Sequence, residues 1–145
     1  MKTIAPHVVR TLLGLVFLVF GLNGFLHFIP QPPPPESAAR FLELFGTSYL
    51  LTFVKGTEVV VAMMLLSNRF VPLALAVLTP ITLNIFAFHA TLAPSGIGMA
   101  VVILALQLGL AWTYRAQYLP MLQAKPSGAG APRTLQSTLS PASAA

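Results

Sequence analysis

Two opposite charges, Lys55 and Glu58, interrupt one of the most apolar segments of the sequence, FVKGTEVVVAMMLL at residues 53–66. A separation of three residues places both side chains on one face of a helix. A buried ammonium group can donate hydrogen bonds to a ligand, and a buried carboxylate can carry a proton. We therefore predict that Lys55 and Glu58 are the catalytic pair, with an ion pair that only holds two helices together as the alternative.

Five further polar residues interrupt the apolar segments and are the candidate ligand-binding residues: Asn23, His27, Asn84, His89 and Gln107. Asn23 and His27 are four residues apart and share a helix face, whereas Asn84 and His89 differ by about 140° of rotation. We expect Asn84 rather than His89 to face a pocket. Each amide could instead only join two helices, and each histidine could be solvated near the membrane surface.

The composition identifies a membrane protein. Of 145 residues, 56% are hydrophobic and 8% are charged, and the mean hydropathy is +0.81. Long apolar runs favour helices over the alternating pattern of a membrane barrel. The chain has no cysteine, which excludes disulfides and cysteine-held metal centres, and no other metal site is predicted. Its net charge of +5 is spread along the chain and does not indicate a nucleic-acid surface.

Four segments have the roughly 20 apolar residues that cross a bilayer. They are residues 8–29, 48–67, 70–92 and 96–117. The first segment resembles a secretory signal, but it lacks an A-x-A-like cleavage site and is predicted to be retained. Three glycines, Gly14, Gly21 and Gly24, are predicted to let the first span approach a neighbour closely.

The connection between the first two spans contains a stiff polyproline segment, PQPPPPE, that no helix can cross. The following residues, 36–45, have Phe41 and Phe45 on an apolar face and predict a short amphipathic helix on the outer membrane surface, ended by Gly46. Residues 123–145 are rich in Pro, Gly, Ser and Ala and predict a disordered cytoplasmic tail. The fold class is therefore an all-α, four-transmembrane-helix bundle with a short outer amphipathic helix after the first span.

Both termini are predicted to be cytoplasmic, because this orientation leaves only Arg40 outside among the basic residues beyond the spans. At 1.5 Å per residue, Lys55, Asn84 and Gln107 then lie roughly 10, 12 and 16 Å below the outer ends of their spans. The polar residues of all four spans are thus predicted to share the outer half of the membrane, where a pocket could open outward.

The sequence resembles the DoxX-like family of small four-helix bacterial membrane proteins over about residues 8–118. The similarity lies in LLGLVFLVFGLNGFLHF, the proline-rich connector, YLLTFVKGTEVVVAMMLL and PLALAVLTPITLNIFAFH. The most specific parts are the K-G-x-E and N-I-x-x-F-H pieces, which start at Lys55 and Asn84. The resemblance implies a membrane domain over residues 1–122, a location in the bacterial inner (plasma) membrane, and a link to membrane redox systems.

From the residues and the resemblance we expect a subunit that binds a quinone or another amphipathic ligand. Lys55, Asn23 and Asn84 would donate hydrogen bonds, Glu58 would carry protons, and the walls would be Phe25, Phe53, Phe86 and Phe88. An electron carrier would have to come from a partner membrane redox subunit. The alternatives are a non-catalytic scaffold or assembly chaperone, and haem held by His27 and His89. Expected partners are the lipid bilayer and such a subunit or a homo-oligomer, but not nucleic acid.

Overall fold

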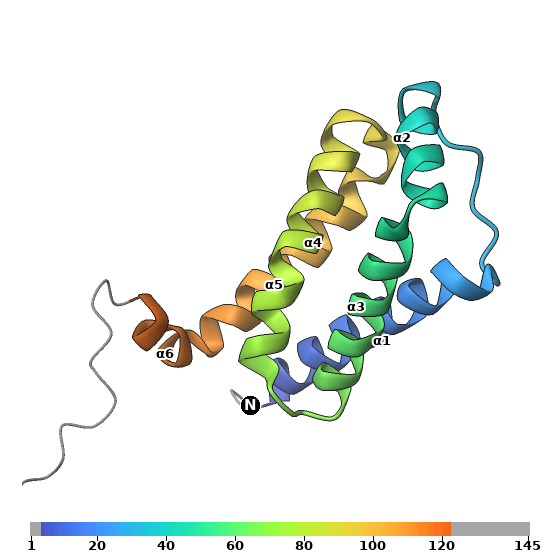
Figure 1. Ribbon diagram of the computed structural model, residues 1–145. Coiled ribbons are helices and arrows are strands. Elements are labelled where there is room, and N and C mark those ends of the chain that lie inside the picture. Colours follow the sequence, from blue (N-terminus) through green and yellow to red (C-terminus); the bar gives the residue numbers. More distant parts are fainter. Residues whose placement is uncertain (1–3, 123–145) are drawn as a thin grey trace, which may run out of the picture.

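The computed structural model describes residues 4–122, and this part of the chain consists of helices joined by short connections (Figure 1). Four helices are long and apolar enough to cross a membrane, as expected for a multi-pass membrane protein. They are α1 (Ile4–Leu26), α3 (Tyr49–Leu66), α4 (Val71–Thr91) and the segment Pro94–Thr113, which consists of a 3-10 turn followed by α5 (Ile97–Thr113). The four predicted spans are confirmed at this level. The predicted tail, residues 123–145, lies outside the described residues.

The first helix ends earlier than its hydropathy predicts. The apolar run continues to Ile29, but α1 ends at Leu26 because His27 adopts a left-handed backbone conformation with φ of 50°. The Asn23 side chain stabilises this ending, since its Oδ1 accepts a hydrogen bond of 2.6 Å from the backbone N–H of Ile29. A left-handed residue after the last helical turn is a common helix termination, although glycine usually occupies it.

The polyproline connector leads into α2 (Glu36–Thr47), which begins as predicted and ends later. Gly46 is not the C-cap, because the helix continues to Thr47 and Ser48 interrupts it with extended backbone angles. The Ser48 hydroxyl then accepts a hydrogen bond from Leu50 N and caps the start of α3. Ser48 therefore separates two helices that glycine was expected to separate.

The bundle buries one side of α2 against the end of α4. Ala38 is fully buried, the Ser37 hydroxyl donates a 2.7 Å hydrogen bond to Leu92 O, and the rings of Phe41 and Phe88 lie 5.4 Å apart. Phe41 nevertheless keeps 41% of its surface exposed. The location of α2 on the outer membrane surface, with lipid covering Phe41 and Phe45, stays a prediction.

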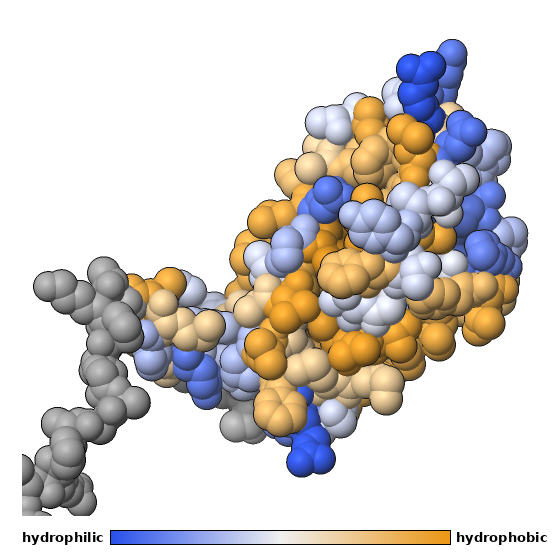
Figure 2. All heavy atoms as spheres, viewed as in Figure 1, coloured by the Kyte–Doolittle hydropathy of each residue, from blue (hydrophilic) through white to orange (hydrophobic). Residues whose placement is uncertain are grey.

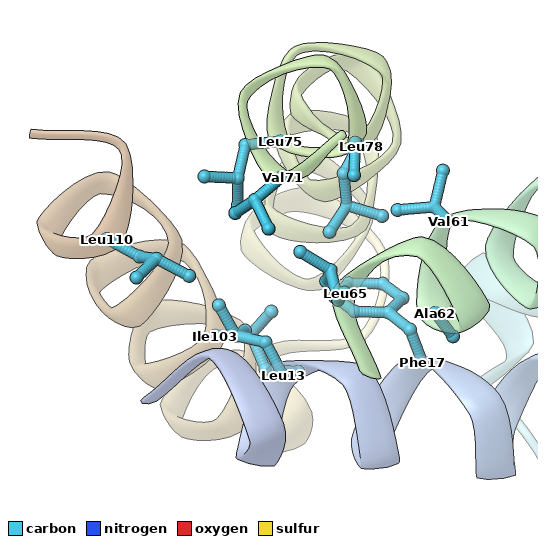
Figure 3. Close-up of a cluster of buried hydrophobic side chains, with 11 residues drawn as sticks. Leu13, Phe17, Val61, Ala62, Leu65, Val71, Leu75, Leu78, Ile103 and Leu110 are labelled. Atoms are coloured by element: carbon cyan, nitrogen blue, oxygen red, sulfur yellow. The ribbon is translucent and has the colours of Figure 1, made fainter. Parts of the chain in front are cut away.

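All four long helices contribute to a single apolar core (Figure 3). Five leucines and Phe17 supply most of its volume, and these side chains interdigitate between the helices and remove apolar surface from contact with solvent or lipid. The labelled core residues are Leu13 and Phe17 of α1, Val61, Ala62 and Leu65 of α3, Val71, Leu75 and Leu78 of α4, and Ile103 and Leu110 of α5. The face seen in Figure 2 is mostly hydrophobic, with its most hydrophilic residues near the two ends of the bundle.

Two short elements, α6 (Arg115–Tyr118) and the 3-10 turn η2 (Leu119–Leu122), follow α5 and extend to one side of the bundle (Figure 1). They are tied to α4 by the Tyr118 hydroxyl, which donates a 2.8 Å hydrogen bond to Pro72 O. Burial, and to a smaller extent Tyr114, raises the pKa of the Tyr118 hydroxyl above its usual value. The hydroxyl therefore stays protonated at neutral pH and keeps this bond.

Candidate functional site: an ion pair beside a glycine seam

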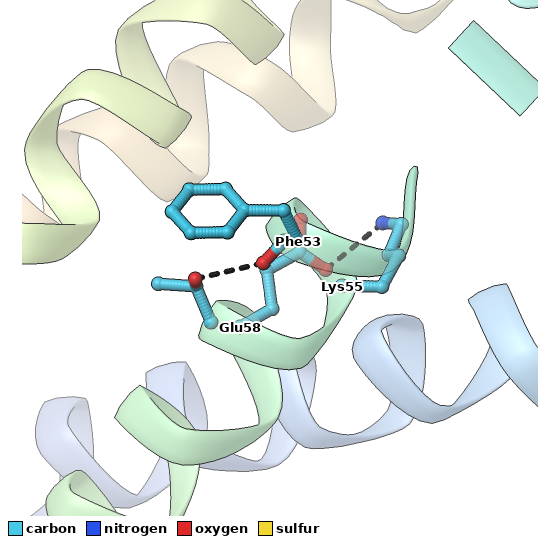
Figure 4. Close-up of polar contacts among 4 residues, drawn as sticks. Phe53, Lys55 and Glu58 are labelled. Atoms are coloured by element: carbon cyan, nitrogen blue, oxygen red, sulfur yellow. Dashed lines mark hydrogen bonds and ion pairs between the residues drawn. The ribbon is translucent and has the colours of Figure 1, made fainter. Parts of the chain in front are cut away.

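Lys55 and Glu58 form an ion pair within α3. Lys55 Nζ and Glu58 Oε2 lie 2.9 Å apart, which joins two residues on successive positions of one helix face (Figure 4). The two side chains differ in exposure, with 22% for Lys55 and 2% for Glu58. The carboxylate is thus enclosed by protein, and the ammonium group is the part that a ligand can approach.

Two glycines of α1, Gly21 and Gly24, lie opposite this pair. A Cβ atom placed on Gly24 would lie 2.4 Å from Lys55 Cγ, and one placed on Gly21 would lie 3.2 Å from Glu58 Cβ. Farther along, a Cβ on Gly14 would lie 2.8 Å from Leu66 Cγ. The predicted packing role of the three glycines is confirmed. We call Gly14, Gly21 and Gly24 the glycine seam.

The ion pair lies at the α1–α3 interface but does not join the two helices. Both charges belong to α3, and the glycine side of α1 offers no side chain to bond them. Among residues 4–122, the hydrogen bonds between α1 and α3 come from Arg10, whose guanidinium donates to the carbonyl oxygens of Leu65 and Leu66 at the end of α3. A cation at the carbonyl end of a helix is favourable because of the helix dipole.

The two polar residues predicted at the end of α1 have separate positions. Asn23 is buried, and both ends of its amide contact the backbone of Ile29, through Oδ1 at 2.6 Å and Nδ2 at 3.4 Å. His27 is exposed just beyond the helix. In the described part of the chain, neither side chain hydrogen-bonds to Lys55 or Glu58, so Asn23 ends a helix here and His27 is open to the surroundings.

The structure orients Asn84 and His89 differently, as their spacing indicates, but in the reverse of the predicted sense. Asn84 is exposed on the outside of α4, whereas His89 is half-buried. His89 Nδ1 lies 3.1 Å from Ala93 O. The His89 ring packs so closely on Gly96 that a Cβ atom on that residue would overlap the ring atom Cε1. The turn at η1 (Pro94–Gly96) therefore fixes His89, which spacing alone could not indicate.

Gln107 belongs to a hydrogen-bonded cluster between α4 and α5 that sequence reasoning missed. Its Nε2 donates to Leu75 O at 3.2 Å and to Thr79 Oγ1 at 3.1 Å, and its Oε1 accepts from the Thr82 hydroxyl. Gln107 and Thr82 are almost fully buried. Thr79 and Thr82 are three residues apart on α4, and this spacing was the available signal for a shared polar face.

A groove of about 430 Å³ runs between α3 and α4, on the side of α3 that faces away from Lys55. Figure 4 shows the Phe53 ring and the Lys55 side chain leaving α3 in different directions. The groove is open and apolar, with Thr52 and Thr57 as its polar members. The lining residues are Thr52, Phe53, Gly56, Thr57, Val60, Val61, Met64, Leu73 and Val77.

The residues present fit part of a quinone site. Lys55 supplies a donor, and Glu58 supplies a proton-carrying group beside it. The four phenylalanines do not form one wall, because Phe53 lines the groove while Phe88 packs on Phe41. Within residues 4–122, histidines and carboxylates form no cluster of three or more that could hold a metal ion.

Comparison of the chain with protein-family models, with curated proteins and with solved structures found no match.

Proposed function

We propose that the chain is a DoxX-like membrane subunit that binds a quinone or a similar lipid-soluble ligand at the Lys55–Glu58 pair, in association with a membrane redox system. The observation that carries this proposal is the placement of both charges on one helix, opposite glycines. An ion pair that locks a fold connects two elements, and this pair connects none. Because removing charges from water costs several kcal/mol per ion, roughly, a pair without a fastening role needs another reason to persist.

The chemistry of the pair suits a ligand with carbonyl oxygens. A lysine ammonium group has three N–H donors, and Glu58 Oε2 accepts from one of them. The remaining donors can bind a quinone oxygen, and the greater exposure of Lys55 makes it the residue that a ligand would contact. Glu58 would exchange a proton with the ligand through Lys55, which lies between the enclosed carboxylate and the accessible side. Electrons would come from a partner subunit, because the chain has no cysteine for a thiol or iron–sulfur centre.

A scaffold or assembly role is the second candidate. It is favoured by the internal bonding of Asn23, His89 and Gln107, three of the five polar residues that a ligand pocket would be expected to leave available. Under this interpretation the chain would act through its lipid-facing surfaces, and the ion pair would serve insertion or folding.

Quinone content after purification separates the two candidates. The variant with both Lys55→Met and Glu58→Leu removes the charges together, and buried pairs replaced by apolar residues of similar size usually leave a protein folded. We expect it to insert and fold but to lose the quinone that co-purifies with the natural chain, measured by lipid extraction and mass spectrometry. It should also fail to restore function in a complementation assay.

Two control variants make this test specific. Exchanging the charges, with Lys55→Glu and Glu58→Lys, keeps an ion pair but removes the accessible donor from position 55, and we expect it to lose the quinone as well. Thr57→Val, on the groove side of α3, should retain it. Full quinone content and activity in both charge variants would refute the site, and loss in Thr57→Val alone would place the ligand in the groove.

We further propose that both termini face the cytoplasm of a bacterial cell, with α2 on the outer side of the plasma membrane. Four crossings place the two ends of the membrane domain on the same side, and the distribution of Lys and Arg favours the inner one. If α2 lies outside, a cysteine placed at Glu43 should react with an impermeant reagent in intact cells. The labelling would be specific, because the natural chain has no cysteine. Labelling only after the membrane is broken would show that α2 faces the cytoplasm and that the proposed orientation is wrong.

A further inference from the structure

The outward face of α4 carries a polar side chain, Asn84, that hydrogen-bonds to none of residues 4–122. Its exposed residues follow one stripe along the helix, at a spacing of three and four residues. We call this stripe the α4 outer face; its members are Leu73, Ala76, Val77, Pro80, Leu83, Asn84, Ala87, Ala90 and Thr91. Asn84 lies seven residues before the end of α4, roughly 10 Å from that end, and thus within the hydrocarbon.

Asn84 differs from the other two amide side chains of the spans. Asn23 is bonded to Ile29, and Gln107 to Leu75 and its threonines, so both satisfy their donors and acceptors inside the protein. Asn84 has no hydrogen bond to any of the described residues. The threonine of the same stripe, Thr91, bonds to Ala87 O of its own helix. An amide exposed to lipid without a partner is unfavourable, because lipid chains offer neither donors nor acceptors.

We propose that a second copy of this chain covers the α4 outer face and that the two Asn84 side chains hydrogen-bond to each other. Two copies inserted in one membrane share an orientation, so a two-fold axis along the membrane normal brings the same residue of both copies to one depth. An asparagine amide both donates and accepts, and a pair of them can satisfy each other reciprocally. The Asn84 of a second copy thus offers both a donor and an acceptor at the depth where Asn84 needs them.

The neighbours of Asn84 suit close contact between two such helices. The amide is flanked on both sides by alanines, Ala76, Ala87 and Ala90, whose small side chains allow a second helix to approach closely. Small residues are enriched where membrane helices meet. Leu73 and Val77 continue the face into the groove beside α3, which leaves room for side chains of the second copy. This inference does not depend on the proposed ligand site, which lies on the opposite side of α3.

Cysteine cross-linking in membranes tests the interface directly, because the chain contains no cysteine. We expect Asn84→Cys to form a disulfide-linked dimer under mild oxidation. The matched control is Ala105→Cys, an exposed small residue eight positions into α5 and so at a similar depth, which should stay monomeric. Equal cross-linking at both positions, or none at position 84, would overturn the proposal.

The mass of the protein in lipid discs tests the role of the amide itself. We expect the natural chain to be dimeric and Asn84→Leu to associate about tenfold more weakly, as the loss of two interhelical amide bonds predicts. Asn84→Leu should keep its helix content and thermal stability, because Asn84 forms no hydrogen bond within the described part of the chain. A monomeric natural chain, an Asn84→Leu variant that remains fully dimeric, or cross-linking from position 84 only to another polypeptide would each refute the second copy as the occupant.

Discussion

The two helix pairs of the bundle are held together in contrasting ways. Between α1 and α3 the glycine seam allows close approach, and the charges of the half-buried Lys55 and the buried Glu58 take no part in joining the helices. Between α4 and α5 a buried amide, Gln107, bonds to side chains and backbone of the facing helix. Gln107 thus joins α4 to α5, whereas at the α1–α3 interface Arg10 supplies the hydrogen bonds and the ion pair joins neither helix to the other. This difference favours a functional role for the ion pair and a structural role for the amide.

The largest effect is expected from filling the glycine seam. In Gly24→Leu the new side chain would collide with the stem of Lys55 close to the backbone of α3. We expect a loss of about 2–3 kcal/mol in the free energy of unfolding, typical of overpacking, measured by thermal unfolding in detergent. Gly109→Leu on α5, where a Cβ meets open space, is the matched control and should unfold like the natural chain. Equal losses of unfolding free energy in the two variants would show that the α1–α3 interface does not depend on close packing at Gly24.

A smaller loss is expected from Gln107→Leu. This change removes the donor to Leu75 O and Thr79 and leaves the Thr82 hydroxyl with only its own helix, so unfolding should become easier by about 1–2 kcal/mol. Adding Thr82→Val should cost little more, because both partners of one bond are then apolar. If the two changes prove independent in a double-mutant cycle, the bond between Thr82 and Gln107 does not help to hold α4 against α5.

The smallest effect is expected from Arg10→Lys, which probes the hydrogen bonds that do link α1 to α3. Lysine keeps the charge near the end of α3 but replaces the planar guanidinium, whose Nη1 donates to both carbonyl oxygens, with a compact ammonium group on a different stem. The expected loss is about 0.5–1 kcal/mol by chemical unfolding, within the range for charges at helix ends. A loss as large as that of Gly24→Leu would show that Arg10, rather than glycine packing, dominates this interface.

Hydropathy predicts the four spans because each apolar run is long and ends at prolines, glycines or charges. It misplaces the end of α1, since the left-handed conformation of His27 depends on the bond between Asn23 and Ile29. The depth of a residue along its helix can also be predicted, by counting residues. The direction in which a side chain faces cannot be predicted in this way, because packing sets the rotation of each helix about its axis. Asn84 therefore lies outside the bundle and Gln107 inside it.

The candidate site is only partly accessible to sequence reasoning for the same reason. The spacing of Lys55 and Glu58 correctly predicts that they share one face of α3, whereas the ion pair was only the alternative interpretation and was expected to hold two helices together. The glycines that face this pair belong to another helix, and no pattern within either segment indicates that Gly21 and Gly24 lie opposite it. Likewise, Thr79 and Thr82 acquire a partner only when α5 packs against α4.

The attachment of α2 to the end of α4 has a consequence for biogenesis. The Ser37 hydroxyl bonds to Leu92 O, and Arg10 bonds to Leu65 O, so each donor precedes its acceptor by 55 residues. At about 5–20 residues per second, the ribosome needs roughly 3–10 seconds to supply the second partner. During that time α1 must wait in the membrane as a single span with its glycine seam open to lipid, and the chain becomes a bundle only as α3 and then α4 leave the translocation machinery.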